Sequence, residues 1–123
     1  MRITTHQQLN VYCESFGAGM EIFTVSKTFP KEELYSLTDQ IRRSSRSVSG
    51  NIAEAWRKRR YEKAFIAKLS DAEGEAAETQ VWLEYALACH YIQKETADAL
   101  TERYNKIIGM IVTMIRFPEK WKV

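Results

Sequence analysis

The 123-residue chain has few of the residues that cross-link a small fold or form its turns, with only two Cys, two Pro and five Gly. So few turn-forming residues argue against a sandwich or barrel built from many short strands. Cys13 and Cys89 are too few for a disulfide framework or a metal knuckle, so we expect reduced thiols in a cytoplasmic protein. No apolar run approaches the ~20 residues that cross a bilayer, and residues 1–8 do not resemble a signal peptide.

The motifs of common enzymes and metal sites are missing as well. The chain contains no glycine-rich phosphate loop, no Cys-x-x-Cys and no His-Glu-x-x-His, which are patterns that bring phosphate-binding or metal-binding groups together. Glu73 and Glu75 are two residues apart, so they point to different sides of a helix. His90 falls on an apolar helix face, where a core histidine is a better interpretation than a ligand. We therefore predict no catalytic residue, cofactor or metal, and no enzyme activity.

What the chain does contain is apolar residues at helical spacing. Steps of three and four residues predict four helices, over about 6–27, 31–57, 61–91 and 94–116, within a single domain of residues 1–123. Pro30 and Pro118 interrupt the pattern, because proline disfavours helix at the residue before it. The connections are short, so consecutive helices should run antiparallel in an up-down-up-down four-helix bundle. The predicted fold class is therefore all-α.

Two of these helices carry more apolar side chains than one bundle needs. The expected core face of the first helix comprises Leu9, Tyr12, Phe16, Met20 and Phe23. Its opposite side is apolar too, with Val11, Ala18, Ile22 and Val25. On the third helix, Trp82, Tyr85 and Cys89 lie beside the core stripe. Exposed apolar area indicates a partner, so the predicted homo-oligomer interface comprises Val11, Ile22, Trp82 and Tyr85. A broad core stripe or a packed terminal tail is the alternative explanation.

Residues 29–55 carry a recognisable pattern. It begins with Phe29-Pro30-Lys31, continues with LTDQIRRS over residues 37–44, and ends with SVSGNIAEA over residues 47–55. The pattern resembles that of the small bacterial four-helix-bundle proteins known as 23S rRNA-intervening sequence proteins, although Ala55 stands where that family usually has glycine. The acidic third helix and the isoleucine-rich fourth helix also fit. The resemblance implies a homo-oligomer, typically a ring of five bundles, and it implies no established activity.

A polar strip runs beside the apolar face of the second helix. Gln40, Ser44, Ser47, Asn51 and Glu54 recur at three- and four-residue steps, and Arg43 flanks them. Amide and carboxylate groups are costly to bury unpaired, so they tend to fix the register of the helices that they join. We predict that helix-to-helix or subunit-to-subunit geometry is held by Gln40, Arg43, Asn51 and Glu54. A solvated face is the alternative.

Charge is unevenly distributed along the chain, although the net charge is only +2. Residues 41–63 contain eight Lys and Arg against Glu54 and Glu62, and an acidic stretch follows them. The candidate contacts to RNA or DNA phosphates are Arg42, Arg46, Arg57 and Arg60. Salt bridges between Arg42 or Arg46 and the acidic third helix of another subunit are the alternative explanation.

These patterns favour a non-enzymatic oligomeric protein that serves as a scaffold or interaction module. Its expected partner is another copy of the same chain, in a homo-oligomeric ring that is a pentamer by resemblance. An accessory factor that binds RNA or DNA through the basic second helix is the alternative function. We expect no membrane partner and no metal.

Overall fold

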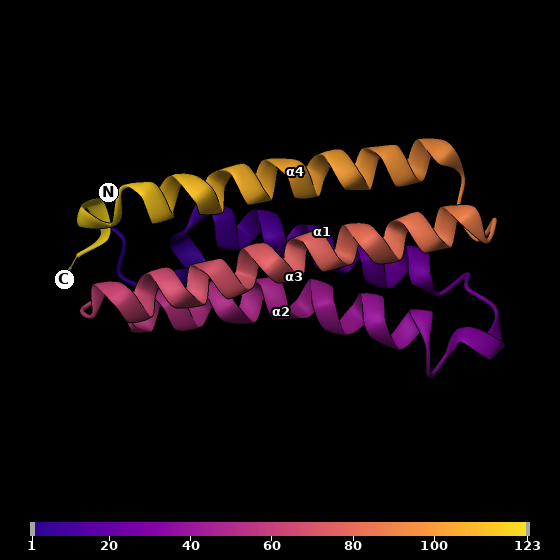
Figure 1. Cartoon of the computed structure of the whole chain (residues 1–123), viewed down its shortest axis with the longest axis horizontal. Helices are drawn as coiled ribbons and strands as arrows, with labels where there is room; N and C mark the ends of the chain where they lie inside the picture. Colours follow the sequence, from indigo (N-terminus) through magenta and orange to yellow (C-terminus); the bar gives the residue numbers. More distant parts are fainter. Residues whose placement is uncertain (1, 123) are drawn as a thin grey trace.

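The computed structural model describes residues 2–122. Four helices form most of this part of the chain: α1 (Asn10–Ser26), α2 (Leu37–Arg57), α3 (Glu62–Ala88) and α4 (Lys94–Arg116). Three short 3-10 turns accompany them: η1 (His6–Gln8), η2 (Lys31–Glu33) and η3 (Pro118–Trp121). Residues 2–122 include no strand, so the prediction of an all-α fold with four helices is confirmed. Figure 1 shows the helices lying side by side along the long axis, with their three connections at alternating ends.

The sequence pattern predicts longer helices than the structure has, except for α4, which has the predicted bounds. Helix α2 begins at Leu37 and not near residue 31, because residues 31–33 form η2 and Ser36 has a non-helical backbone (φ −128°, ψ −106°). The Leu37 N–H then donates to Glu33 Oε1 at 3.1 Å. Helix α1 begins at Asn10, because Leu9 is extended. Within residues 2–122, no helix has the length and apolar character that crossing a membrane requires.

Helices α3 and α4 each bury one regular stripe of residues at helical spacing. The buried residues of α3 are Phe65, Leu69, Ala72, Ala76, Thr79, Leu83 and Ala86. Those of α4 are Ala97, Leu100, Tyr104, Ile107, Ile111 and Met114. Small side chains bring α2 and α3 within direct hydrogen-bonding reach, since the hydroxyls of Ser44 and Thr79 are 2.8 Å apart and both residues are buried. A buried polar pair of this kind stabilises one register of the two helices.

The side of helix α1 that faces the core is opposite to the side that its sequence favours. Its buried residues are Val11, Ser15, Ala18, Ile22 and Ser26. Phe16 and Met20, which we expected in the core, are 53% and 51% exposed. Val11 and Ile22 are 3% and 1% exposed, so they are core residues of the subunit. Their prediction as part of an oligomer interface is wrong, because a partner cannot reach them.

The reason for this reversal lies in the small residues between α1 and α2. The hydroxyls of Ser15 and Ser49 are 3.1 Å apart across this seam, and a Cβ built on Gly19 would lie in ordinary van der Waals contact with the carbonyl oxygen of Ser45, at 3.9 Å. Small side chains let two helices approach closely, and a densely packed interior leaves no room there for an aromatic ring. The bulky side chains of α1 therefore lie at the rim of the seam and not inside it.

Helix α3 ends in a turn centred on His90. The N–H groups of His90 and Tyr91 donate to the carbonyls of Leu87 and Ala86 at 3.0 and 2.9 Å, which is the hydrogen-bond pattern of a Schellman motif. His90 has a φ of 64°, in the left-handed region where glycine is more usual, and its side chain is exposed. The expectation of a core histidine is therefore wrong, because the helix ends before His90 and this residue adopts the turn.

An arginine connects α4 to α1. Arg103 forms an ion pair with Glu21 and lies 3.6 Å from Glu14. A Cβ built on Gly17 would lie 2.5 Å from Arg103 Nη2. The glycine therefore leaves the space in which the guanidinium group crosses α1.

The buried tyrosine of α4 offers a test of this packing. Tyr104 is fully buried, and its hydroxyl has no hydrogen-bond partner among residues 2–122; burial also raises the pKa of Tyr104. Because an unpaired buried hydroxyl carries a desolvation cost, we expect Tyr104→Phe to raise the free energy of unfolding by about 1 kcal/mol. Urea denaturation measures this change.

The matched control is Ser44→Ala, which removes a buried hydroxyl that does have a partner. It should lower the free energy of unfolding by about 1 kcal/mol. A Tyr104→Phe variant that is destabilised as much as Ser44→Ala would contradict the packing described here and would indicate a bound water at the hydroxyl.

Candidate interaction surfaces

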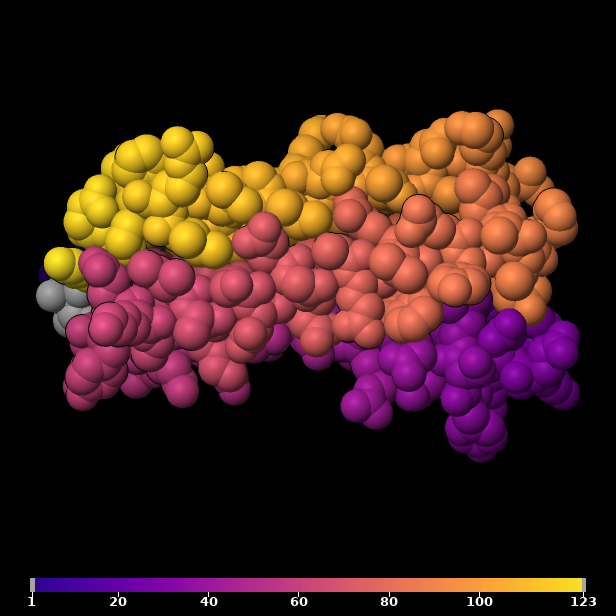
Figure 2. Space-filling view, viewed as in Figure 1, coloured from indigo at the N-terminus to yellow at the C-terminus, as the bar shows by residue number. Residues whose placement is uncertain are grey.

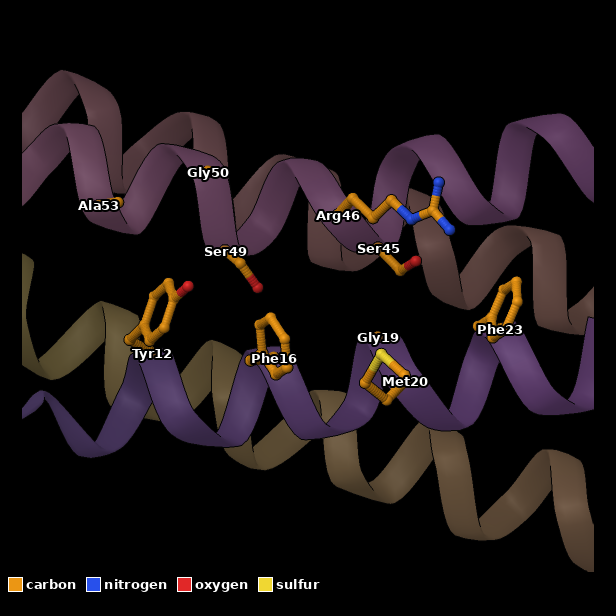
Figure 3. Close-up of a pocket in the computed structure, with 10 residues that line it drawn as sticks. All are labelled: Tyr12, Phe16, Gly19, Met20, Phe23, Ser45, Arg46, Ser49, Gly50 and Ala53. Carbon is orange, nitrogen blue, oxygen red and sulfur yellow. The ribbon is translucent and has the colours of Figure 1, made fainter. Parts of the chain in front are cut away.

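Helices α1 and α2 form a groove on one side of the bundle, which we call the α1/α2 groove. It has a volume of about 360 Å³. Figure 3 shows the side chains of Tyr12, Phe16, Met20 and Phe23 along α1, turned toward α2. The α2 side is lined mainly by small residues, namely Ser45, Ser49, Gly50 and Ala53. An apolar wall opposite a row of small residues suits the side chains of another helix.

Cations gather at one end of the α1/α2 groove around the ring of Phe23. Lys27 Nζ, Arg42 Cζ and Arg46 Cζ lie 4.6, 4.9 and 5.9 Å from the ring centroid. Arg42 is half-buried, and its Nε donates to Ser26 Oγ at 2.8 Å, so this guanidinium is held in place. Arg46 is exposed at the rim of the groove. The groove is therefore apolar along its length and positively charged at the Phe23 end.

A second apolar surface lies on the solvent side of α3, and we call it the α3 outer face. It comprises seven exposed residues at helical spacing: Ala67, Ser70, Gly74, Ala77, Val81, Tyr85 and Ala88. Figure 2 looks onto α3, which runs across the surface of the molecule between α2 and α4. Val81 is 41% exposed and Tyr85 is 56% exposed. Acidic residues flank this face, including Asp71, Glu78 and Glu84. Helix α3 is therefore apolar or small both toward the core and toward solvent.

The two aromatic residues that we predicted at an interface lie near the end of this face. The rings of Trp82 and Tyr85 are 6.0 Å apart, and both line a pocket of about 340 Å³ between α3 and the start of α2. Trp82 is half-buried, and Cys89 is exposed in the same pocket. Both aromatic residues have surface that a partner could reach. Their role in an oligomer stays a prediction.

The four predicted assembly residues of α2 have different surroundings. Glu54 forms an ion pair with Lys68 of α3, with 2.7 Å between Glu54 Oε2 and Lys68 Nζ. The hydrogen bond with Lys68 lowers the pKa of Glu54. Asn51 donates instead to the Ser47 carbonyl of its own helix at 2.9 Å. Gln40 and Arg43 are exposed. Only Glu54 therefore joins two helices within the subunit, and a subunit-to-subunit role for the others stays a prediction.

The four predicted phosphate-binding arginines fall into two separate pairs. Arg42 and Arg46 belong to the groove, as described above. Arg57 is the last residue of α2, Arg60 lies in the turn that follows, and both are exposed. The rise from Arg42 to Arg57 is about 22 Å. The sequence did not show that cations from both ends of the chain, including Arg2 and Lys120, lie beside the second pair.

These features define a small all-α four-helix protein with exposed apolar and basic surfaces. The chain belongs to the family of 23S rRNA-intervening sequence proteins, since the model of that family matches residues 7–113. The resemblance inferred from residues 29–55 is thus confirmed. A comparison with curated protein sequences finds no match.

The fold is similar to the crystal structure of a protein from Bacteroides thetaiotaomicron. That protein is of unknown function and belongs to the S23 ribosomal protein family. The sequences are 28% identical, the match covers 85% of this chain and 97% of the other, and the TM-score is 0.77. The family and the four-helix fold therefore agree, and neither defines an activity.

A hydrogen bond that depends on pH joins the connections at one end of the bundle. Tyr91 Oη donates to Glu33 Oε2 at 2.8 Å. This bond, followed by the one from the Leu37 N–H, lowers the pKa of Glu33 from its ordinary value of 4.5. The same bond raises the pKa of Tyr91 to about 12. It is therefore fully formed only while the carboxylate is ionised and the phenol is protonated.

We expect Tyr91→Phe to destabilise the protein at neutral pH and by progressively less at either extreme. The contribution of Glu33 to the free energy of unfolding is present above pH 4.5 and is lost as the pH falls, because its pKa is lowered on folding. That of Tyr91 is present below pH 10 and is lost as the pH rises toward about 12, because its pKa is raised. The measurement is the difference in unfolding free energy between wild type and variant across pH. A difference that does not change with pH would contradict this account, and Tyr35→Phe, at a tyrosine that is 92% exposed, is the control.

Proposed function

We propose that this protein is a non-enzymatic cytoplasmic interaction protein that assembles with copies of itself. Each subunit is an antiparallel up-down-up-down bundle, and the assembly is a closed ring, with five copies as the family resemblance implies. The α3 outer face is the observation that carries this proposal. A helix at the edge of a bundle normally presents polar residues to water, and this face has small and apolar residues along almost the whole helix.

Helix α4 provides the contrast within the same subunit. Its solvent side carries charged and exposed residues, including Glu95, Asp98, Glu102 and Lys106. Helices α3 and α4 thus differ in the surface that they turn outward, although both bury a regular apolar stripe. An extended apolar face on α3, beside a charged face on α4, indicates a specific contact and not a generally apolar surface.

The α1/α2 groove supplies a complementary surface. Its apolar wall and small residues could receive the α3 outer face of a second copy, and its Arg42 and Arg46 would meet acidic residues such as Glu78. Opposite charges at the edges of two surfaces favour one orientation of docking. Because the two surfaces are different, each copy would use one to bind the next copy and the other to bind the previous one. Such a head-to-tail contact forms a ring when the rotation closes.

The test is a pair of identical substitutions at exposed alanines on two helices. Ala77→Lys places a charge on the α3 outer face, and Ala99→Lys places the same charge on the polar side of α4. We expect Ala77→Lys to disrupt assembly, because a lysine cannot be buried unpaired in an apolar contact. Ala99→Lys should leave the assembly unchanged. Light scattering of the size-separated protein measures the mass, and circular dichroism checks that both variants remain helical.

A mixing experiment tests whether the groove is the complement of the α3 outer face. Met20→Lys damages the groove and leaves the α3 outer face intact, whereas Ala77→Lys does the reverse. Together, the two variants should form a heterodimer through their one undamaged pair of surfaces, although neither assembles alone. Retention of the wild-type mass by Ala77→Lys would contradict the proposal for α3. A mixture that forms no heterodimer would contradict the role of the groove.

Association with RNA or DNA is a second candidate function. One observation favours it: among residues 2–122, no side-chain carboxylate lies within 4.0 Å of the guanidinium groups of Arg42, Arg46, Arg57 or Arg60. Arginines without an ion-pair partner are available for phosphate oxygens, which they can contact through two donors at once.

Filter binding to a structured RNA across a salt series tests this candidate. Phosphate contacts release counterions, so the affinity should fall steeply between about 50 and 200 mM salt. We expect a substitution of all four arginines by glutamine to reduce both the affinity and its dependence on salt. Affinity that does not change with salt, or that is the same in the variant, would contradict a role for these arginines.

A further inference from the structure

Positive charge is concentrated at one end of the bundle. Three separate stretches of sequence meet there: Arg2, residues 57–63 and residues 116–122, all at the left end of Figure 1. They contain half of the 18 Lys and Arg of the chain, namely Arg2, Arg57, Lys58, Arg59, Arg60, Lys63, Arg116, Lys120 and Lys122. Of the 16 Asp and Glu, only Glu62 and Glu119 lie in these stretches. We call this region the basic end, and it is strongly positive although the whole chain is nearly neutral.

A pocket of about 320 Å³ opens within the basic end. Four of its lining residues are cationic: Arg2, Arg59, Lys120 and Lys122. The others are Ile3, Trp56 and Trp121, so the lining includes no carboxylate. Trp121 is half-buried and leaves part of its side chain accessible. The pocket therefore combines flat aromatic surface with several positive charges.

Arg59 shows how closely these charges are held together. Its Cζ lies 3.7 Å from the centroid of the Trp56 ring, and its Nη1 donates to the Trp56 carbonyl at 2.7 Å. Burial and then the neighbouring charges of Arg57, Arg60 and Arg2 lower the pKa of Arg59. Like charges destabilise one another at short range. The arrangement would therefore be stabilised by an anion.

The protein itself provides little compensation for this charge. Among residues 2–122, the only ion pair that joins the basic end to a side-chain carboxylate is between Lys122 and Glu62, at 3.9 Å. The exposed side chains of Arg57, Arg60 and Lys120 have no such partner in that part of the chain. A ligand with several regularly spaced negative charges would match them better than a single small anion.

We propose that the basic end binds single-stranded nucleic acid, with phosphates on the exposed cations and an unstacked base against Trp121 or the Arg59–Trp56 pair. Aromatic rings and guanidinium planes stack on bases, and a positive groove beside them follows the backbone. A duplex hides its bases from such a pocket. This proposal rests on the second candidate function, and it places the site at Arg57 and Arg60 and not at Arg42 and Arg46.

The first experiment compares two double variants that each lose two exposed cations. Arg60→Gln with Lys120→Gln removes them from the basic end. Lys31→Gln with Lys106→Gln removes them elsewhere on the bundle. The probe is a labelled single-stranded oligouridylate of about 20 nucleotides, and fluorescence anisotropy measures its affinity across a salt series. Circular dichroism and mass measurement accompany each variant, so that unfolding or altered assembly is detected.

We expect the basic-end variant to bind about tenfold more weakly at low salt. The slope of the logarithm of its affinity against the logarithm of the salt concentration should be shallower by about 0.7 for each lost phosphate contact. The control variant should bind within about twofold of wild type. Equal losses in both variants would overturn the location of the site while leaving nucleic-acid binding in place. No binding by the wild-type protein would overturn this proposal together with the second candidate function. Neither result bears on self-assembly, because the mass is measured separately.

The second experiment tests the stacked base. Trp121→Leu keeps an apolar side chain but removes the aromatic ring, and Trp121→Phe restores a ring. We expect Trp121→Leu to weaken oligouridylate binding at least about fivefold and Trp121→Phe to recover most of it. Heparin, which has negative charges but no bases, should bind both variants equally. Equal affinity of Trp121→Leu and wild type for oligouridylate would overturn the stacking and leave a general polyanion surface.

Discussion

A helix in a four-helix bundle can bury only one side within its own subunit, and α3 has two sides that favour burial. Its inner side contributes Phe65, Leu69 and Leu83 to the core, and its outer side presents Ala77, Val81 and Tyr85 to solvent. Burial of apolar surface is the main favourable term in association as it is in folding. The outer side therefore leaves apolar surface in water, and this feature links the fold to the proposed function.

Small residues govern the rest of the arrangement. Serines, alanines and glycines occupy the seams between helices, as in the Ser15–Ser49 and Ser44–Thr79 contacts. Close approach of the helices leaves Phe16 and Met20 at the rim, where they form the wall of the α1/α2 groove. The same close packing thus stabilises the subunit and creates a second apolar surface. The proposed self-assembly and the stability of the subunit would depend on the same residue types for this reason.

The sequence was a good guide to elements with one apolar side and a poor guide to elements with two. The bounds of α4 could be predicted, because it has one apolar side and a charged opposite side. For α1 both sides are apolar, and the choice between them depends on how closely α2 approaches, which periodicity does not report. Val11 and Ile22 were consequently assigned to the wrong surface. The turn at His90 was also missed, because a histidine gives little indication of a left-handed backbone.

The basic end could not be predicted for a different reason. The excess charge of residues 41–63 is visible in the sequence. Its extension by Arg2 and Lys120, and the position of Trp121 beside them, depend on which ends of the helices meet in three dimensions. The structure also separates Arg42 and Arg46, held at the Phe23 ring, from Arg57 and Arg60. One basic helix thereby divides into a surface suited to another copy of the chain and a surface suited to phosphates.

The central claim is that the outward side of α3 is covered by another copy of the chain. Sedimentation of the unmodified protein over a wide range of dilution tests it most directly. The account predicts one species whose mass is a fixed multiple of 14.3 kDa, with five as the expected multiple. A stable 14.3 kDa particle at all concentrations would leave α3 exposed and would contradict the claim.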